Sequence, residues 1–118
     1  MITPTIYDFH SSDLPEVATW QPAANEPIDY WLTLDIGSGG EGTDEFQVRI
    51  ASPDALIANG PSPCRATIAI SRNGYSFAAV QLVLEQTVAS CARESWEDCA
   101  LALSRYFLWE YEDHQFVD

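Results

Sequence analysis

The sequence predicts an α+β domain, with a mostly antiparallel sheet of about five strands and two main helices packed on one face. The first observation behind this prediction is a set of short segments in which apolar and polar residues alternate, as they do in half-buried strands. The second is a pair of later segments in which apolar residues recur at steps of three and four, as on amphipathic helices. The expected order is strand, strand, strand, short helix, strand, helix, helix, strand, which favours the α+β class.

The N-terminal segment is expected to contain one strand and one long connection. Residues 2–9 have the composition of a strand, and Pro4 either places this strand at an edge of the sheet or delays its start. The connection from Ser11 to Pro27 has little periodicity and several prolines, and one helical turn is expected near residues 14–18.

A regular hairpin is expected next. Residues 28–36 alternate between apolar and polar, and residues 44–50 repeat this alternation. The glycine-rich run 37–42 joins the two strands if they pair. A phosphate-binding loop is the other interpretation of this run, but the run lacks a Gly-Lys-Ser/Thr ending, precedes a strand and lies among acidic residues that would repel phosphate. Glycines that accept a positive φ in a wide turn are sufficient to explain it.

A short helix and a fourth strand are expected after the hairpin. Ser52 and Pro53 suit the N-cap and the first position of a helix, which Asn59-Gly60-Pro61 ends. Residues 64–71 then have the pattern of a strand, and residues 72–74 form its turn.

Two helices and a last strand complete the pattern. Ser76 caps the longer helix, which is expected to run to about Ala92. Ser95 begins the second helix with a sequence that resembles a capping box. The final strand is expected within residues 106–113, where aromatic and acidic residues alternate.

Length and composition set the broad class of the protein. A chain of 118 residues has the size of one domain, so residues 1–118 are expected to form a single domain. A hydrophobic fraction of 47% and an aromatic fraction of 12% exclude disorder. The apolar runs are far shorter than the roughly 20 residues of a membrane span, and the N-terminus lacks the pattern of a secretory signal. We therefore expect a cytoplasmic protein with no membrane partner.

The net charge is the most informative property of the composition. The chain has 18 acidic residues against five basic ones, all of them arginine, and its formal net charge is -13. Such a charge indicates a positively charged partner and excludes a surface that holds nucleic acid. An inhibitor that docks on a basic protein, an enzyme built on carboxylates, and a domain whose charge only maintains solubility are all consistent with it.

Cysteine and histidine residues do not indicate an active site. Cys64, Cys91 and Cys99 are odd in number and form no Cys-x-x-Cys pair, so buried reduced thiols are expected and a zinc site is not. His10 and His114 lie near the ends of the chain, and sequence neighbours are seldom placed for a nucleophilic relay. No metal-binding motif singles out one set of acids. We expect no catalytic residue, no metal ligand and no cofactor, with a metal-dependent carboxylate hydrolase or an acidic scaffolding domain as alternatives.

The acidic residues are concentrated in two groups. Each group is either a solvated face or part of an anionic docking surface with Trp and Tyr anchors. The first group surrounds the hairpin and consists of Asp35, Glu41, Asp44 and Glu45. The second covers the start of the second main helix and the last strand and consists of Glu94, Glu97, Asp98, Glu110, Glu112 and Asp113.

Several blocks of the sequence resemble a known family. They are Ile36-Gly37 with Gly42-Thr43-Asp44-Glu45-Phe46-Gln47-Val48, Ser52-Pro53-Asp54-Ala55-Leu56, Ser95-Trp96-Glu97-Asp98-Cys99, and Leu103-Ser104-Arg105-Tyr106-Phe107-Leu108-Trp109-Glu110-Tyr111-Glu112-Asp113. In order and spacing these blocks are similar to the immunity protein 8 family of bacterial polymorphic-toxin and contact-dependent inhibition systems. The resemblance extends from Ile28 to Asp113, and its last block is the most specific.

The resemblance implies an α+β immunity protein that binds one cognate toxin C-terminal domain and performs no catalysis. Many delivered toxins are nucleases with basic grooves, so an acidic inhibitor would imitate their anionic substrate in charge. We therefore expect stoichiometric occlusion of a basic nuclease in a 1:1 complex. The candidate toxin-binding residues are Asp35, Glu41, Asp44, Glu45, Glu94, Glu97, Glu110 and Glu112.

Overall fold

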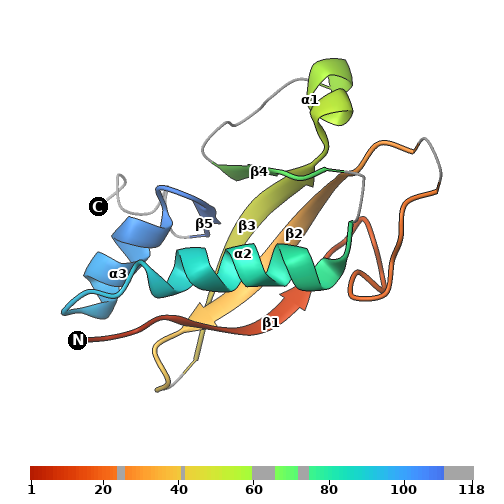
Figure 1. Cartoon of the computed structure of the whole chain (residues 1–118). Coiled ribbons are helices and arrows are strands. Elements are labelled where there is room, and N and C mark those ends of the chain that lie inside the picture. The colour runs from red at the N-terminus through yellow and green to blue at the C-terminus, as the bar shows by residue number, and fades with distance from the viewer. Residues whose placement is uncertain (24–25, 41, 60–65, 72–74, 111–118) are drawn as a thin grey trace.

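The chain folds into a five-stranded sheet with three helices, in a computed structural model that describes residues 1–23, 26–40, 42–59, 66–71 and 75–110. The elements follow one another in the predicted order (Figure 1). Their bounds are β1 Thr5–His10, β2 Asp29–Gly37, β3 Asp44–Ala51, α1 Pro53–Asn59, β4 Thr67–Ala69, α2 Phe77–Ala89, α3 Trp96–Leu103 and β5 Leu108–Trp109. The predicted α+β class is confirmed.

The sheet is mostly antiparallel, as predicted. Its strand order is β1-β2-β3-β4, and β5 also pairs with β3. The second edge of β3 is therefore shared: β4 pairs with its C-terminal end in parallel, and β5 pairs antiparallel with residues 46–47. A parallel pair needs a crossover connection, and α1 lies in that connection.

One face of the sheet forms the core with α2 and α3. In β2 the alternate residues Tyr30, Leu32, Leu34 and Ile36 are at most 1% exposed. They share one buried cluster with helix residues, among them Phe77, Val80, Leu84, Val88, Ala100 and Leu103. Figure 1 shows α2 lying across the sheet with α3 near its C-terminal end. We call the opposite side of the sheet the open face; on β2 and β3 it carries Trp31, Thr33, Asp35, Glu45, Gln47 and Arg49.

Both predicted caps of the main helices are confirmed. The Ser76 hydroxyl accepts a bond from the N–H of Ala79, and the Ser95 hydroxyl accepts one from the N–H of Asp98, each at 3.1 Å. The longer helix ends at Ala89, earlier than Ala92, because the hydroxyls of the last turn bond main-chain carbonyls and compete with the helical pattern. None of the described helices has the length and apolar character needed to cross a bilayer.

The strands at the two ends of the chain are shorter than predicted. The first begins at Thr5, after Pro4, and Ile2 forms an isolated bridge with Arg93 instead. The last comprises only Leu108–Trp109, because the N–H groups of Tyr106 and Phe107 still bond the carbonyl of Leu103. The predicted residues 111–113 of this strand, and residues 64–65 of the fourth strand with its turn 72–74, lie outside the described residues.

Candidate functional site

Three carboxylates lie side by side across the open face, near the end of the hairpin. The strand register places Asp8 opposite Asp35, and Asp35 opposite Glu45. Asp8 reaches this position because a register shift between Ile6 and Asp8 inserts one extra residue in β1. Directly opposite side chains on antiparallel strands have Cβ atoms about 4.5–5.5 Å apart. The three acids therefore form a continuous line over three strands.

Glu110 extends this line beyond β3. Its N–H donates to the carbonyl of Glu45 at 3.0 Å, and the N–H of Glu45 donates to Glu110 Oε1 at the same distance. The Glu110 carboxylate thus accepts the bond from the N–H of Glu45 just beyond the end of β5. We call Asp8, Asp35, Glu45 and Glu110 the carboxylate row.

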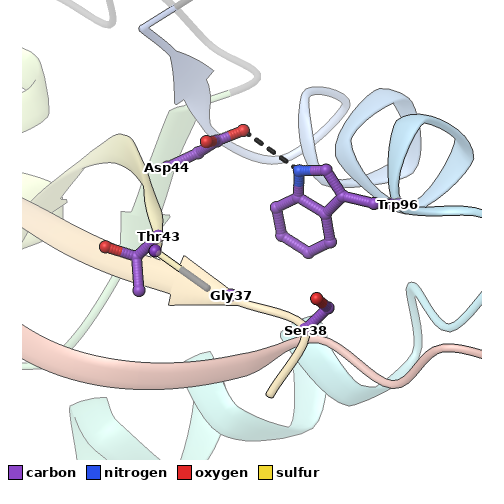
Figure 2. A pocket seen from close by; sticks show the side chains of 6 residues that line it. Gly37, Ser38, Thr43, Asp44 and Trp96 are labelled. Carbon is purple, nitrogen blue, oxygen red and sulfur yellow. Dashed lines mark hydrogen bonds between the residues drawn. The ribbon is translucent and has the colours of Figure 1, made fainter. Parts of the chain in front are cut away.

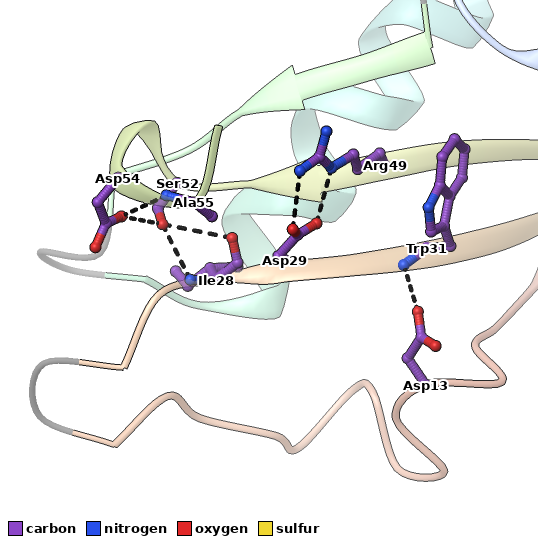
Figure 3. A network of polar contacts seen from close by, with 8 residues as sticks. All are labelled: Asp13, Ile28, Asp29, Trp31, Arg49, Ser52, Asp54 and Ala55. Atoms are coloured by element: carbon purple, nitrogen blue, oxygen red, sulfur yellow. Dashed lines mark hydrogen bonds and ion pairs between the residues drawn. The ribbon is translucent and has the colours of Figure 1, made fainter. Parts of the chain in front are cut away.

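Among the described residues, no arginine forms an ion pair with the carboxylate row. Arg49 is committed to Asp29, with its Nε 2.8 Å from Oδ1 and its Nη2 2.8 Å from Oδ2 (Figure 3). Arg93 donates from Nη1 to the carbonyls of Ser90 and Ala92. Like charges directly opposite one another in a sheet destabilise it. The row is a source of repulsion that a positively charged partner would relieve.

The opposite face of the same hairpin end holds a small pocket beside a tryptophan. Asp44 Oδ2 accepts bonds from the indole Nε1 of both Trp96 and Trp109, each at 3.2 Å. The Trp109 ring stacks on Phe46, with ring centroids 6.1 Å apart and planes 8° from parallel. Figure 2 shows the Trp96 ring beside Asp44, with Ser38 below it. The pocket, which we call the tryptophan pocket, has a volume of about 160 Å³ and is lined by Gly37, Ser38, Gly42, Thr43, Asp44 and Trp96.

Glycines are required at two positions of this pocket. A Cβ on Gly37 would lie 2.9 Å from the carbonyl oxygen of Gly42, closer than such atoms pack. Gly42 itself has φ +72°, a left-handed conformation that side chains disfavour. The expected positive φ is found at Gly39 and Gly42, so the glycine-rich run serves a turn as predicted, and this turn also shapes the pocket.

The structure places most of the candidate acids predicted from the sequence at one end of the molecule. Asp44 bonds Trp96, and Glu97, the next residue, is exposed at the start of α3 together with Glu94. Glu45 bonds Glu110, so the hairpin group and the C-terminal group meet at one end of the molecule. Glu41 and Glu112 lie outside the described residues.

Sequence reasoning missed two features of the site. Asp8 joins the row only through the register shift in β1, which no local pattern signals. The two indoles converge on Asp44 from segments 13 residues apart in sequence, although Trp96 and Trp109 were visible as aromatic residues among the acids. Both depend on tertiary contacts.

Two acids of the row, together with His10, could hold a metal ion. One ligand atom each from Asp8, His10 and Asp35 lies within 4.8 Å of the others, and carboxylate and imidazole groups suit divalent ions. Exposed acidic groups are common without an ion, so the absence of a metal ligand stays a prediction.

The described thiols are buried. Cys91 and Cys99 are free and buried, and burial raises the pKa of the Cys91 thiol, which disfavours the nucleophilic thiolate. The reduced, buried state expected for them is confirmed, and Cys64 lies outside the described residues.

Comparison with known proteins identifies the family. Neither the curated proteins nor the solved structures searched gave a match. A family model described as immunity protein 8 matches residues 5–114, which is nearly the whole chain. The matched residues include all the strands and helices described above, the carboxylate row and the tryptophan pocket. The chain therefore belongs to the immunity protein 8 family, and its function is that of an immunity protein against a toxin.

Proposed function

We propose that this immunity protein blocks a toxin domain with a basic surface, a nuclease, by covering that surface in a 1:1 complex without catalysis. The observation that carries the proposal is the carboxylate row, in which Asp8, Asp35 and Glu45 face one another across three strands with no described arginine paired to them. A fold gains nothing from such an arrangement, because the repulsion lowers its stability. Binding to a cationic surface turns the same charges into a favourable contact.

A nuclease supplies the complementary charge. Its groove must neutralise phosphates, so it presents Lys and Arg side chains at a spacing set by the nucleic acid backbone. A line of carboxylates over neighbouring strands, about 4.8 Å apart in the sheet, offers anionic groups at a comparable spacing. Covering the groove would exclude the nucleic acid substrate.

The charge of the whole molecule should also speed the encounter. A net charge of -13 attracts a cationic partner over distances of about one Debye length, which is near 8 Å at physiological salt. Electrostatic steering raises association rates above the roughly 10⁵–10⁶ M⁻¹s⁻¹ of neutral pairs. We propose that Asp44, Glu94 and Glu97, together with Glu41 and Glu112, add to this field around the row.

The test uses the toxin encoded beside this protein. We expect a stable 1:1 complex whose association rate falls steeply as salt is added. The triple variant Asp8→Asn/Asp35→Asn/Glu45→Gln should associate about tenfold more slowly and with a weaker salt dependence. Stopped-flow fluorescence measures both quantities.

A control for the loss of a single charge outside the row is Glu16→Gln, which removes one exposed acid from the connection between β1 and β2. It should change the association rate by less than about twofold. An association rate that changes neither with salt concentration nor with the triple substitution would contradict the electrostatic part of the proposal. Failure to form any complex would contradict the proposal as a whole.

A metal-dependent hydrolase is the second candidate, favoured by the cluster of Asp8, His10 and Asp35. Calorimetry with Mg²⁺, Mn²⁺ and Ca²⁺ separates the two functions, because a catalytic site binds an ion stoichiometrically and a diffuse acidic surface does not. We expect no stoichiometric binding. An acidic scaffolding domain is distinguished more simply, since its neighbouring gene would encode no toxin.

A further inference from the structure

We propose that the tryptophan pocket receives the side chain of one arginine from the toxin. This inference rests on the proposed function and adds a specific anchor to it. The carboxylate row lies on the open face and acts through charge, whereas the pocket lies at the same end on the helix side and has a defined shape. An arginine held there would fix the orientation of the complex.

The size of the pocket limits its occupant. Its volume is about 160 Å³. Pockets for cofactors and drug-sized ligands occupy about 300–1,000 Å³, so those ligands are too large. The head group of one side chain fits.

The chemistry of the lining selects a planar cation. Asp44 uses Oδ2 for both indole bonds, and no described residue donates to its Oδ1, so that oxygen is available as a charged acceptor. Figure 2 shows the Ser38 hydroxyl directed toward the Trp96 ring. A guanidinium stacks on indole rings and donates several hydrogen bonds in its plane, and it is less strongly hydrated than an ammonium group. Arginine therefore matches this lining better than lysine.

The start of α3 does not oppose a cation here. The N-terminus of a helix carries a partial positive charge, which would disfavour a cation beside Trp96. Two acids in the first turn of α3, Glu97 and Asp98, counter this charge. One of the described N–H groups of that turn, the N–H of Asp98, is satisfied by Ser95.

The substitution Asp44→Asn tests the pocket with little risk to the fold. An asparagine keeps one carbonyl oxygen with two lone pairs, so both indole bonds can persist. Its amide N–H₂ replaces the charged Oδ1 and presents donors to the arginine. We expect the dissociation rate of the toxin complex to rise about tenfold while the association rate stays within about twofold, because loss of a desolvated charge partner acts on dissociation.

Two further variants bracket this result. Ser38→Leu fills the pocket from an exposed hairpin position and leaves Asp44 and both tryptophans unchanged, so it should raise the dissociation rate in the same way. Glu16→Gln removes an equal charge far along the sequence and should change neither rate. If the wild-type protein forms the complex and both pocket variants dissociate from the toxin at the wild-type rate, the arginine anchor is overturned but the proposed function stands. If the wild-type protein forms no complex with the toxin, the proposed function itself is overturned, and the anchor with it.

A probe without the toxin tests the pocket itself. N-acetyl-arginine amide is titrated while the indole Nε1–H resonance of Trp96 is followed by NMR. The expected result is a saturable shift that the uncharged N-acetyl-citrulline amide and the Asp44→Asn variant both lack. An equal shift with citrulline, a larger shift with N-acetyl-lysine amide, or no shift with arginine overturns the assignment.

Discussion

Asp29 and Asp35 lie on the same strand and the same open face, but their surroundings are opposite. The carboxylate of Asp29 receives two charged N–H groups from Arg49 at 2.8 Å, and the side chain of that arginine is only 5% exposed. Asp35 stands between Asp8 and Glu45, two further carboxylates. One end of the face is neutralised and packed, and the other end carries repulsion.

This difference separates acids that hold the fold from acids that are available to a partner. A buried charge is costly unless it is paired, so the ion pair at Asp29 is part of the folded structure. Opposed like charges weaken the sheet, so their presence is not explained by folding. The net charge of the sequence counts both kinds equally, and only the register of the strands tells them apart.

The largest effect is expected from Asp29→Asn. The substitution removes the carboxylate charge that faces the buried guanidinium of Arg49 and should lower the free energy of unfolding by about 2–4 kcal/mol. Urea denaturation followed by tryptophan fluorescence measures the loss. The rate of toxin association should change little, because Asp29 lies away from the row.

A second Asp→Asn substitution should change the free energy of unfolding in the opposite direction. Asp35→Asn removes the central charge of the row and should raise the free energy of unfolding by about 0.5–1 kcal/mol, since two repulsive pairs disappear. The same urea titration measures it. A loss of stability as large as that of Asp29→Asn would mean that Asp35 has a structural partner, and the distinction drawn between the two acids would be wrong.

Much of the fold follows from local patterns in the sequence. Alternation in β2 and β3 defines the hairpin, and the serines at positions 76 and 95 mark the starts of α2 and α3. The predicted bounds of α2 and β5 are less accurate. Near the end of α2, side-chain hydroxyls bond main-chain carbonyls and compete with the helical pattern. After α3, Tyr106 and Phe107 belong to a turn, although their sequence alternates as in a strand.

The candidate site could be predicted only as a set of residue types. The concentration of acids near the hairpin and near Trp96 was visible in the sequence, and the structure brings the two groups together. Which acids stand opposite one another depends on strand register, and the extra residue in β1 that aligns Asp8 with Asp35 has no sequence signature. The pocket depends on the approach of two indoles to one carboxylate, which is a tertiary contact.

The most direct test is a map of the toxin contact by cross-saturation NMR, in which signals are transferred from the toxin to amides of the bound immunity protein. We predict the strongest transfer at the hairpin end, at Asp8, Asp35, Glu45 and Trp96. The main competing surface is the exposed side of α2, where Leu82 and Val83 are 56% and 42% exposed. Transfer centred on that helix, with none at the carboxylate row, would contradict the account.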